Sequence, residues 1–174
     1  MKVAIFGAGT MGRGIAQVFA ANGHTALMYA SSIASAQRHR DELDASLQKR
    51  VAKGKMPQGA KDALMANVFV EEESAAADAD LVIECIAEEM GPKKELFHRL
   101  DELCKPETVF ATNTSSLSIT EMGHGLKHPL IGMHFFNPVP SMKLIEIIRG
   151  VNTPQETFDF TYKLAQDIGK EPVE

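Results

Sequence analysis

A glycine-rich turn at the start of the chain constrains its fold more than any other feature. Gly7-x-Gly9-x-x-Gly12 follows the apolar run Lys2–Phe6 and opens a segment of helical composition that reaches about Asn22. In that context the first glycine permits a tight turn, the second lets a pyrophosphate approach the backbone, and the third lets the helix pack against the sheet. The sequence therefore predicts a dinucleotide-binding loop, with a turn needed only for packing as the alternative. The loop comprises Gly7, Ala8, Gly9, Thr10, Met11 and Gly12.

Strand and helix patterns alternate along the chain. Strands are predicted at Lys2–Phe6, Thr25–Tyr29, Val68–Val70, Leu81–Cys85 and Val109–Thr112, and apolar strand-like runs end at His134 and cover Leu144–Ile148. Helices are predicted from the glycine turn to about Asn22, and over about Ala34–Lys53, Pro57–Ala66, Pro92–Leu103 and Pro154–Ile168. This alternation implies an α/β fold with a mainly parallel sheet covered on both faces. A length of 174 residues fits one domain, residues 1–174.

The bulk composition narrows the classes of partner. A net charge of -5 disfavours a nucleic-acid surface. No run approaches the roughly 20 apolar residues that a membrane-spanning helix needs. Cys85 and Cys104 are isolated and are expected to be reduced thiols, with no disulfide framework and no metal site. We therefore expect a soluble, cytoplasmic protein.

One part of the expected dinucleotide site is missing. About 20 residues after the glycines, an Asp or Glu normally binds the adenosine ribose, and here the position is Ala30, followed by Ser31 and Ser32. A hydrogen bond to a charged group is worth about 1.5–3 kcal/mol, so NAD binding should be weakened by roughly ten- to a hundredfold. The serines can replace part of this contact. We expect NAD to remain preferred because no Arg follows Ala30 directly, although NADP use becomes possible.

A histidine and a glutamate form the candidate reactive pair. His134 ends an apolar strand-like run, and Glu146 stands inside the apolar run Leu144–Ile148. A carboxylate among Leu and Ile is costly to bury without a partner, and the nearest obvious cation is the imidazolium of His134. A base held by an acid is suited to proton transfer at neutral pH. The alternative is a structural ion pair that joins two strands.

Five motifs together resemble one enzyme family. They are Gly7–Gly12, Asp80–Glu84, Asn113–Leu117, Gly132–Pro138 and Met142–Glu146, and in this order they closely resemble the 3-hydroxyacyl-CoA dehydrogenases, particularly the bacterial 3-hydroxybutyryl-CoA branch. The resemblance covers essentially the whole chain. It implies a Rossmann-like, doubly wound domain with a protruding helical pair, and reversible oxidation of a (3S)-hydroxyacyl-CoA to the 3-oxoacyl-CoA.

The resemblance also implies a second domain. Members of the family carry a C-terminal helical domain that supplies dimer contacts, and this sequence stops at Lys170–Glu174, about where that domain would begin. We therefore expect the helical domain to be absent here, the isolated domain to turn over poorly, and the full-length protein to be a homodimer.

The resemblance assigns roles to individual residues. It makes His134 the general base, Glu146 the residue that orients the imidazole, and Ser115 a hydrogen-bond partner of the substrate oxygen and the cofactor, with a helix N-cap as the alternative for Ser115. It makes Asn137 a nicotinamide-side contact and Glu88 a cofactor contact. We interpret Asn113 as a turn residue and Glu84 as a local structural residue.

Two further assignments concern lysines. Lys93 matches a position near both cofactor and CoA, although a lysine in the first turn of a helix is usually exposed and solvated. Ser46, Lys49 and Lys53 fall on one face of the long helix, and the resemblance implies that they meet the phosphates of an acyl-CoA substrate. A solvated helix face is the alternative for these three.

Two other functions remain open at this stage. A dehydrogenase of free 3-hydroxy acids or carnitine-like substrates would share the same plan, and the Lys49–Lys53 cluster weakly disfavours it. A non-catalytic protein similar to lens lambda-crystallin would share the scaffold, and the joint presence of His134, Glu146 and Ser115 argues against it.

Overall fold

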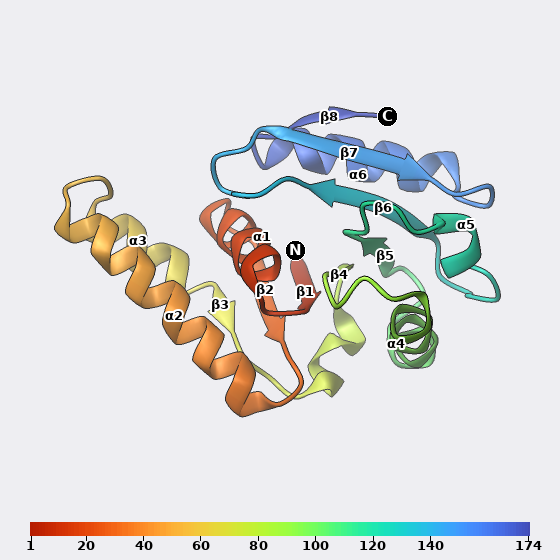
Figure 1. Cartoon of the computed structure of the whole chain (residues 1–174), viewed down its shortest axis with the longest axis horizontal. Helices are drawn as coiled ribbons and strands as arrows, with labels where there is room; N and C mark the ends of the chain where they lie inside the picture. The colour runs from red at the N-terminus through yellow and green to blue at the C-terminus, as the bar shows by residue number, and fades with distance from the viewer.

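Eight strands form one sheet in the computed structural model, which describes residues 1–174 (Figure 1). The strands are β1 (Lys2–Phe6), β2 (Thr25–Tyr29), β3 (Val68–Phe69), β4 (Leu81–Glu84), β5 (Val109–Thr112), β6 (Leu130–Phe135), β7 (Leu144–Arg149) and β8 (Glu171–Val173). Their order is β3-β2-β1-β4-β5-β6-β7-β8. The pairs from β3 to β6 are parallel, β6 and β7 are antiparallel, and β7 and β8 are parallel. The order reverses between β1 and β4, which makes the sheet doubly wound.

Helices cover both faces of the sheet. They are α1 (Thr10–Ala21), α2 (Ile33–Ala52), α3 (Gln58–Met65), the 3-10 helix η1 (Glu73–Asp78), α4 (Met90–Leu103), α5 (Ile119–Met122) and α6 (Gln155–Asp167). None of them combines the length and the apolar character that crossing a bilayer requires. Helices α2 and α3 lie side by side and project from the sheet, as the resemblance implied (Figure 1).

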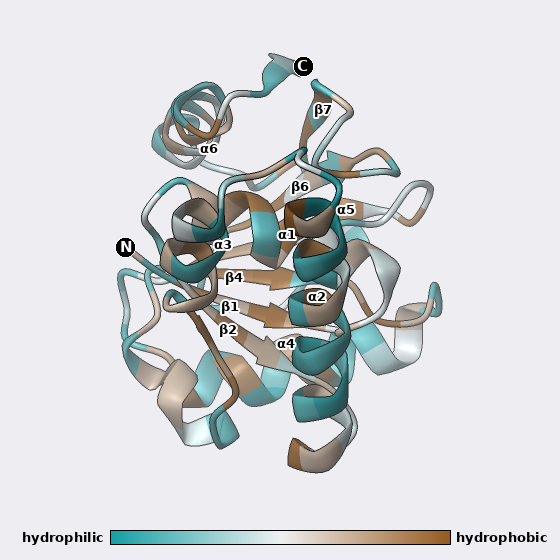
Figure 2. Cartoon of the chain, turned by 90° about the vertical axis from the view of Figure 1, so that its left-hand side faces the viewer, coloured by the Kyte–Doolittle hydropathy of each residue, from teal (hydrophilic) through white to brown (hydrophobic).

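Two hydrophobic cores follow from the alternation of side chains along the central strands. Val3 and Ile5 point into the core under α1, α3 and α6, whereas Ala4 and Phe6 point into the core under η1, α4 and α5. Figure 2 shows these apolar strands at the centre of the molecule and a hydrophilic outer surface on α2. The predicted parallel sheet, covered on both faces, is therefore confirmed.

The structure also contains elements that the sequence patterns did not predict. The single turn α5 is too short to show helical periodicity, and β8 has only three residues and contains Pro172. Proline is tolerated at an edge strand because an unpaired edge needs no N–H donor. The Ala-rich segment before β4 forms η1. The predicted strands and helices are otherwise present, with ends that differ by one or two residues.

Candidate functional site

The glycine loop has the geometry of a dinucleotide-binding turn. Gly7 has a φ of +108°, and a Cβ placed there would lie 2.4 Å from the carbonyl oxygen of Cys85. A Cβ on Gly12 would lie 1.6 Å from the carbonyl oxygen of Gly7, so α1 packs directly against the turn. A Cβ on Gly9 would meet nothing within 4 Å. Of the three glycines only Gly9, the N-cap of α1, faces open space, as the second glycine of a dinucleotide-binding turn must for a pyrophosphate to approach the backbone.

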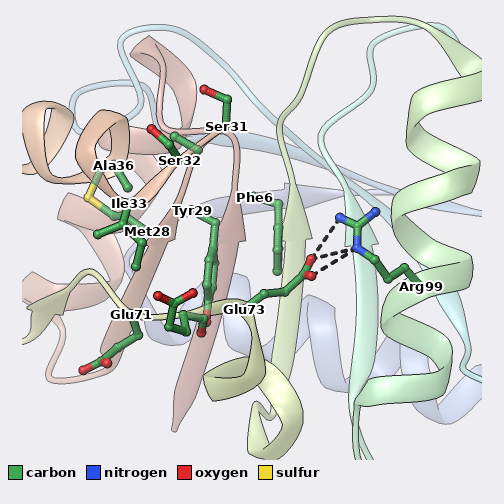
Figure 3. Close-up of a pocket in the computed structure, with 12 residues that line it drawn as sticks. Phe6, Met28, Tyr29, Ser31, Ser32, Ile33, Ala36, Glu71, Glu73 and Arg99 are labelled. Atoms are coloured by element: carbon green, nitrogen blue, oxygen red, sulfur yellow. Dashed lines mark hydrogen bonds and ion pairs between the residues drawn. The ribbon is translucent and has the colours of Figure 1, made fainter.

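The end of β2 borders two adjoining cavities of about 470 and 290 Å³. Ala30 and Ser31 line both of them, and Gly7 and Ala8 line the larger one. The rings of Phe6 and Tyr29 stack at 4.3 Å between centroids (Figure 3). The two cavities lie on the β1–β2 side of the point where the strand order reverses, which is the side that holds the adenosine half of a dinucleotide in doubly wound sheets.

Serines and glutamates surround Ala30, which stands where the ribose-binding acid is normally found. The Oγ of Ser32 caps α2 by accepting a hydrogen bond from the N–H of Ser35 at 3.1 Å, so Ser31 is the serine that remains for a ribose contact. The segment after β3 borders the same cavity, because β2 and β3 are parallel neighbours whose carboxyl ends meet at one edge. Glu71, Glu72 and Glu73 line the 290 Å³ cavity together with Ala30. In Figure 3, Glu73 extends to the guanidinium of Arg99, at 2.9 Å.

The predicted histidine–glutamate pair is present. His134 and Glu146 lie directly opposite each other in the antiparallel β6–β7 pair, and His134 Nδ1 lies 3.2 Å from Glu146 Oε1. The Nε2 atom makes no hydrogen bond within the chain. With Nδ1–H donating to the carboxylate, Nε2 carries the lone pair and is free to accept a proton.

The expectation that Glu146 is buried was wrong. Its side chain is 43% exposed, whereas that of His134 is 19% exposed. Ile145 and Ile147 point into the core under α6, but Leu144 and Glu146 point to the other face of β7, which α5 covers only near Ile148. An apolar run that resembles a fully buried strand is therefore half-exposed here.

Ser115 lies in the turn after β5 and is exposed. Its N–H donates to Glu88 Oε1 at 3.1 Å, and its Oγ makes no hydrogen bond within the chain. The N-cap alternative for Ser115 is excluded, because the hydroxyl that caps α5 belongs to Ser118 and accepts from the N–H of Glu121 at 3.1 Å.

Lys93 is not the solvated lysine that its place in the first turn of α4 suggested. It is 1% exposed, and its Nζ lies 2.6 Å from Glu84 Oε1 and 3.0 Å from Glu88 Oε2. Burial by itself raises the pKa of Glu88, but hydrogen bonds from Thr114 and Lys93 outweigh it and hold the pKa below its ordinary value. Glu88 is therefore an anion at neutral pH.

Asn113 is a site residue that sequence reasoning missed. Its Oδ1 accepts a hydrogen bond from the N–H of Phe135 at 2.8 Å, and its own N–H donates to the carbonyl oxygen of Glu84 at 2.9 Å. It therefore links the carboxyl ends of β4, β5 and β6 beside His134. The sequence signal for this role was its position directly after the buried strand β5. A residue that only forms a turn occurs at the same position, so the signal did not distinguish the two roles.

Asn137, Thr10 and Ser46 are brought together by the loop between β6 and β7. They line one cavity of about 200 Å³ between that loop, α1 and α2, in which Arg13 and Glu42 also form an ion pair. Lys49 and Lys53 are exposed further along α2, and Lys53 is its C-cap residue. The structure thus places Ser46 near the glycine loop and leaves the two lysines on the protruding helical pair.

Comparisons with known proteins show the family of this chain. The family described as "3-hydroxyacyl-CoA dehydrogenase, NAD binding domain" matches residues 2–174. A 3-hydroxybutyryl-CoA dehydrogenase of Clostridioides difficile is 45% identical over 177 residues, covering 100% of this chain and 63% of that protein. The 3-hydroxyadipyl-CoA dehydrogenase of Escherichia coli K12 is 42% identical, covering 98% of this chain and 37% of that protein.

A solved structure of a relative has the same fold as this chain. The crystal structure of 3-hydroxybutyryl-CoA dehydrogenase from Escherichia coli K12 superposes with a TM-score of 0.95 at 41% identity, covering 99% of this chain and 37% of that chain. The chain thus spans about 63% and 37% of the curated relatives described above. The chain therefore belongs to the 3-hydroxyacyl-CoA dehydrogenase family, as an NAD-binding domain.

Proposed function

We propose that this chain is the cofactor-binding and proton-transfer part of an enzyme that reversibly oxidises a (3S)-3-hydroxyacyl-CoA to the 3-oxoacyl-CoA. Short-chain substrates such as 3-hydroxybutyryl-CoA are favoured, since relatives at 39–45% identity carry that name. The observation that carries the proposal is the His134–Glu146 pair at 3.2 Å, on the strands that continue the sheet beyond β4. In a doubly wound sheet this is the nicotinamide half of the cleft.

Each residue has a role in this proposal. NAD, when bound, supplies the acceptor for the hydride that leaves C3 of the substrate. His134 Nε2 takes the proton of the 3-hydroxyl group, and Glu146 holds the imidazole through Nδ1 and stabilises its protonated form. The free Oγ of Ser115 donates to the substrate oxygen, where it stabilises developing negative charge.

The cofactor contacts extend along the carboxyl edge of the sheet. The loop Gly7–Gly12 holds the pyrophosphate, and Glu88 and Asn137 take the nicotinamide side. NAD is preferred over NADP, because three glutamates, Glu71–Glu73, line the cavity beside Ala30, and the one cation there, Arg99, is paired with Glu73. Ser46, Lys49 and Lys53 meet the phosphates of CoA, and the first of these lines the cavity next to Asn137.

Two assignments for the whole protein stay predictions. Dimerisation follows only from the family resemblance. A cytoplasmic location is supported by the similarity to bacterial 3-hydroxybutyryl-CoA dehydrogenases.

Binding and turnover test the proposal. Titration of this chain with NADH should saturate, and the product of the whole gene should reduce acetoacetyl-CoA with NADH. CoA should compete with acetoacetyl-CoA for the cofactor-bound protein, whereas an enzyme for free 3-hydroxy acids would be insensitive to CoA. Tight NADH binding without turnover of any 3-oxoacyl-CoA would contradict the assigned reaction and favour a non-catalytic protein.

A further inference from the structure

The larger cavity at the end of β2 receives no carboxylate from that strand, because Ala30 stands where the ribose-binding acid is normally found. Gly7 and Ala8 of the glycine loop line this 470 Å³ cavity, whereas neither of them lines the 290 Å³ cavity beside it. The adenosine ribose of a dinucleotide is joined to the pyrophosphate, so the cavity next to the glycine loop is the one suited to the ribose. The group that binds the ribose should therefore lie around the larger cavity.

One face of α2 borders this cavity. Ser35 and His39, which are one helical turn apart, line it beside Ala30. Both are half-buried, whereas Arg38 between them is exposed. Because α2 directly follows β2, this face of the helix lies next to the position of the missing acid.

The imidazole of His39 is held by a carboxylate on its own helix. Its Nδ1 lies 3.3 Å from Glu42 Oε2, three residues further along α2. The same oxygen accepts from Arg13 of α1, and Arg38 Nε lies 3.9 Å from the other oxygen. In the neutral imidazole, Nδ1–H therefore donates to the carboxylate, and Nε2 carries the lone pair. Nε2 makes no hydrogen bond within the chain, so it is available to a ligand.

The other polar side chains around the cavity are less suited to this contact. Ser35 Oγ already accepts a hydrogen bond from Arg38 at 3.3 Å. Glu95 lines the cavity from α4, which follows β4, and β1 separates β4 from β2 in the sheet. Ser31 is exposed, and no contact within the chain fixes its hydroxyl. On the β2 side of the cavity, His39 thus offers an acceptor that is both free and held in place.

We propose that His39 replaces the missing acid, with Nε2 accepting a hydrogen bond from the 2′-hydroxyl of the adenosine ribose. Glu42 is a positioning residue, which holds the imidazole through Nδ1 and keeps the lone pair on Nε2. The inference rests on the proposed function, in which the chain binds NAD, and it names a residue that recognises the adenosine half.

Paired titrations of this chain test the inference, with NADH and with its analogue in which hydrogen replaces the 2′-hydroxyl of the adenosine ribose. The parent should bind NADH about three- to tenfold more tightly than the analogue, as expected for one hydrogen bond. His39→Ala should lose most of this preference and bind NADH about as weakly as the parent binds the analogue. The preference compares two ligands of one folded protein, so small changes in stability do not affect it.

Glu42→Ala tests the positioning role. NADH and the analogue carry the same charge, so the ratio of their affinities is insensitive to the loss of the carboxylate charge. Glu42→Ala should lower the preference, because Nδ1 loses its acceptor, and it should cause no further loss of preference in His39→Ala. A parental preference in Glu42→Ala would overturn the role of Glu42.

Two controls separate this contact from other contacts in the cavity. Glu95→Gln changes a side chain that lines the same cavity from α4, and it should keep the parental preference. Loss of the preference in Glu95→Gln, with retention in His39→Ala, would move the ribose contact to α4 and overturn the inference. NADPH is the second control, because an imidazole that accepts from a hydroxyl gives no hydrogen bond to a 2′-phosphate. A larger loss of NADPH affinity than of NADH affinity in His39→Ala would show a phosphate contact instead.

Failure of the inference is distinguishable from failure of the proposed function. A parent that binds NADH and the analogue equally well, or a full preference in His39→Ala, would overturn the role of His39 and leave the proposed function intact. A parent chain that does not bind NADH would overturn both.

Discussion

Asn113 and Phe135 are joined by a hydrogen bond from the Phe135 N–H to Asn113 Oδ1, at 2.8 Å. Phe135 directly follows His134, so the turn after β5 sets the position of the backbone that carries the imidazole. The residue assigned from sequence to turn formation alone thus connects the two segments that hold Ser115 and His134.

Replacing Asn113 should therefore destabilise the fold. Asn113→Ala leaves the partly buried N–H of Phe135 without an acceptor, which costs about 1–3 kcal/mol. Urea unfolding of this chain measures the loss. Ser116→Ala in the same turn is the control, because the Ser116 side chain is exposed. Equal stability of the two variants would show that the Asn113 contact contributes nothing.

Restoring the missing ribose acid should tighten cofactor binding. Ala30→Asp places a carboxylate at the end of β2, where a charged hydrogen bond to the ribose gains roughly tenfold in NADH affinity. The same change should weaken NADPH binding further by repulsion of the 2′-phosphate. Parallel titrations with NADH and NADPH check both effects, with Ala34→Asp as a control for added charge on α2. Unchanged affinity for both cofactors would mean that residue 30 does not face the ribose.

The stability of the fold should depend on pH through Asp101. Burial raises the pKa of this carboxyl, but hydrogen bonds from the N–H of Lys127 and from His128 outweigh it and hold the pKa below the ordinary value of 3.8. The ionised form is therefore stabilised in the folded state. This contribution is present above the unfolded pKa and is lost as the pH falls through the folded pKa.

Urea unfolding between pH 7 and about pH 2 measures this dependence. The parent should lose more stability on acidification than Asp101→Asn, which is less stable at neutral pH and cannot titrate at that position. Parallel stability curves for the two proteins would exclude Asp101 as a source of the dependence.

Glu146 should matter for rate more than for stability. Because its side chain is 43% exposed, its pairing with His134 is worth little to the fold. Glu146→Gln in the whole gene product should keep the melting temperature within a few degrees and lower kcat for acetoacetyl-CoA reduction by about tenfold or more, through the loss of imidazolium stabilisation. Glu171→Gln, on the neighbouring strand β8, is the matched control. An unchanged kcat in Glu146→Gln would reduce the pair to a structural contact.

Local signals explain which parts of the fold could be predicted. The glycine turn, the central strands and the pairing of His134 with Glu146 depend on short-range patterns or on a carboxylate that needs a partner, and all of these are confirmed. Strand β8 was missed because it has only three residues and contains a proline, so its sequence shows no strand pattern.

The missed features of the site depend on contacts between distant segments. Lys93 is buried between Glu84, at the end of β4, and Glu88, in the loop that follows. The residues around Lys93 in the first turn of α4 do not reveal these partners. Glu146 is exposed because α6 packs on the opposite face of β7, and α5 reaches the face that carries Glu146 only near Ile148. The carboxylates beside Ala30 come from the segment after β3, about 40 residues along the chain, and only the pairing of β2 with β3 brings them there.

The most direct test of the assigned chemistry is the effect of His134→Gln on acetoacetyl-CoA reduction by the whole gene product, with NADH binding measured in parallel. General-base catalysis is worth about 10²–10⁴ in rate, so kcat should fall at least about a hundredfold while NADH affinity and melting temperature stay close to those of the parent. A kcat within about tenfold of the parent, in a folded protein that binds NADH, would contradict the role of His134 as the general base.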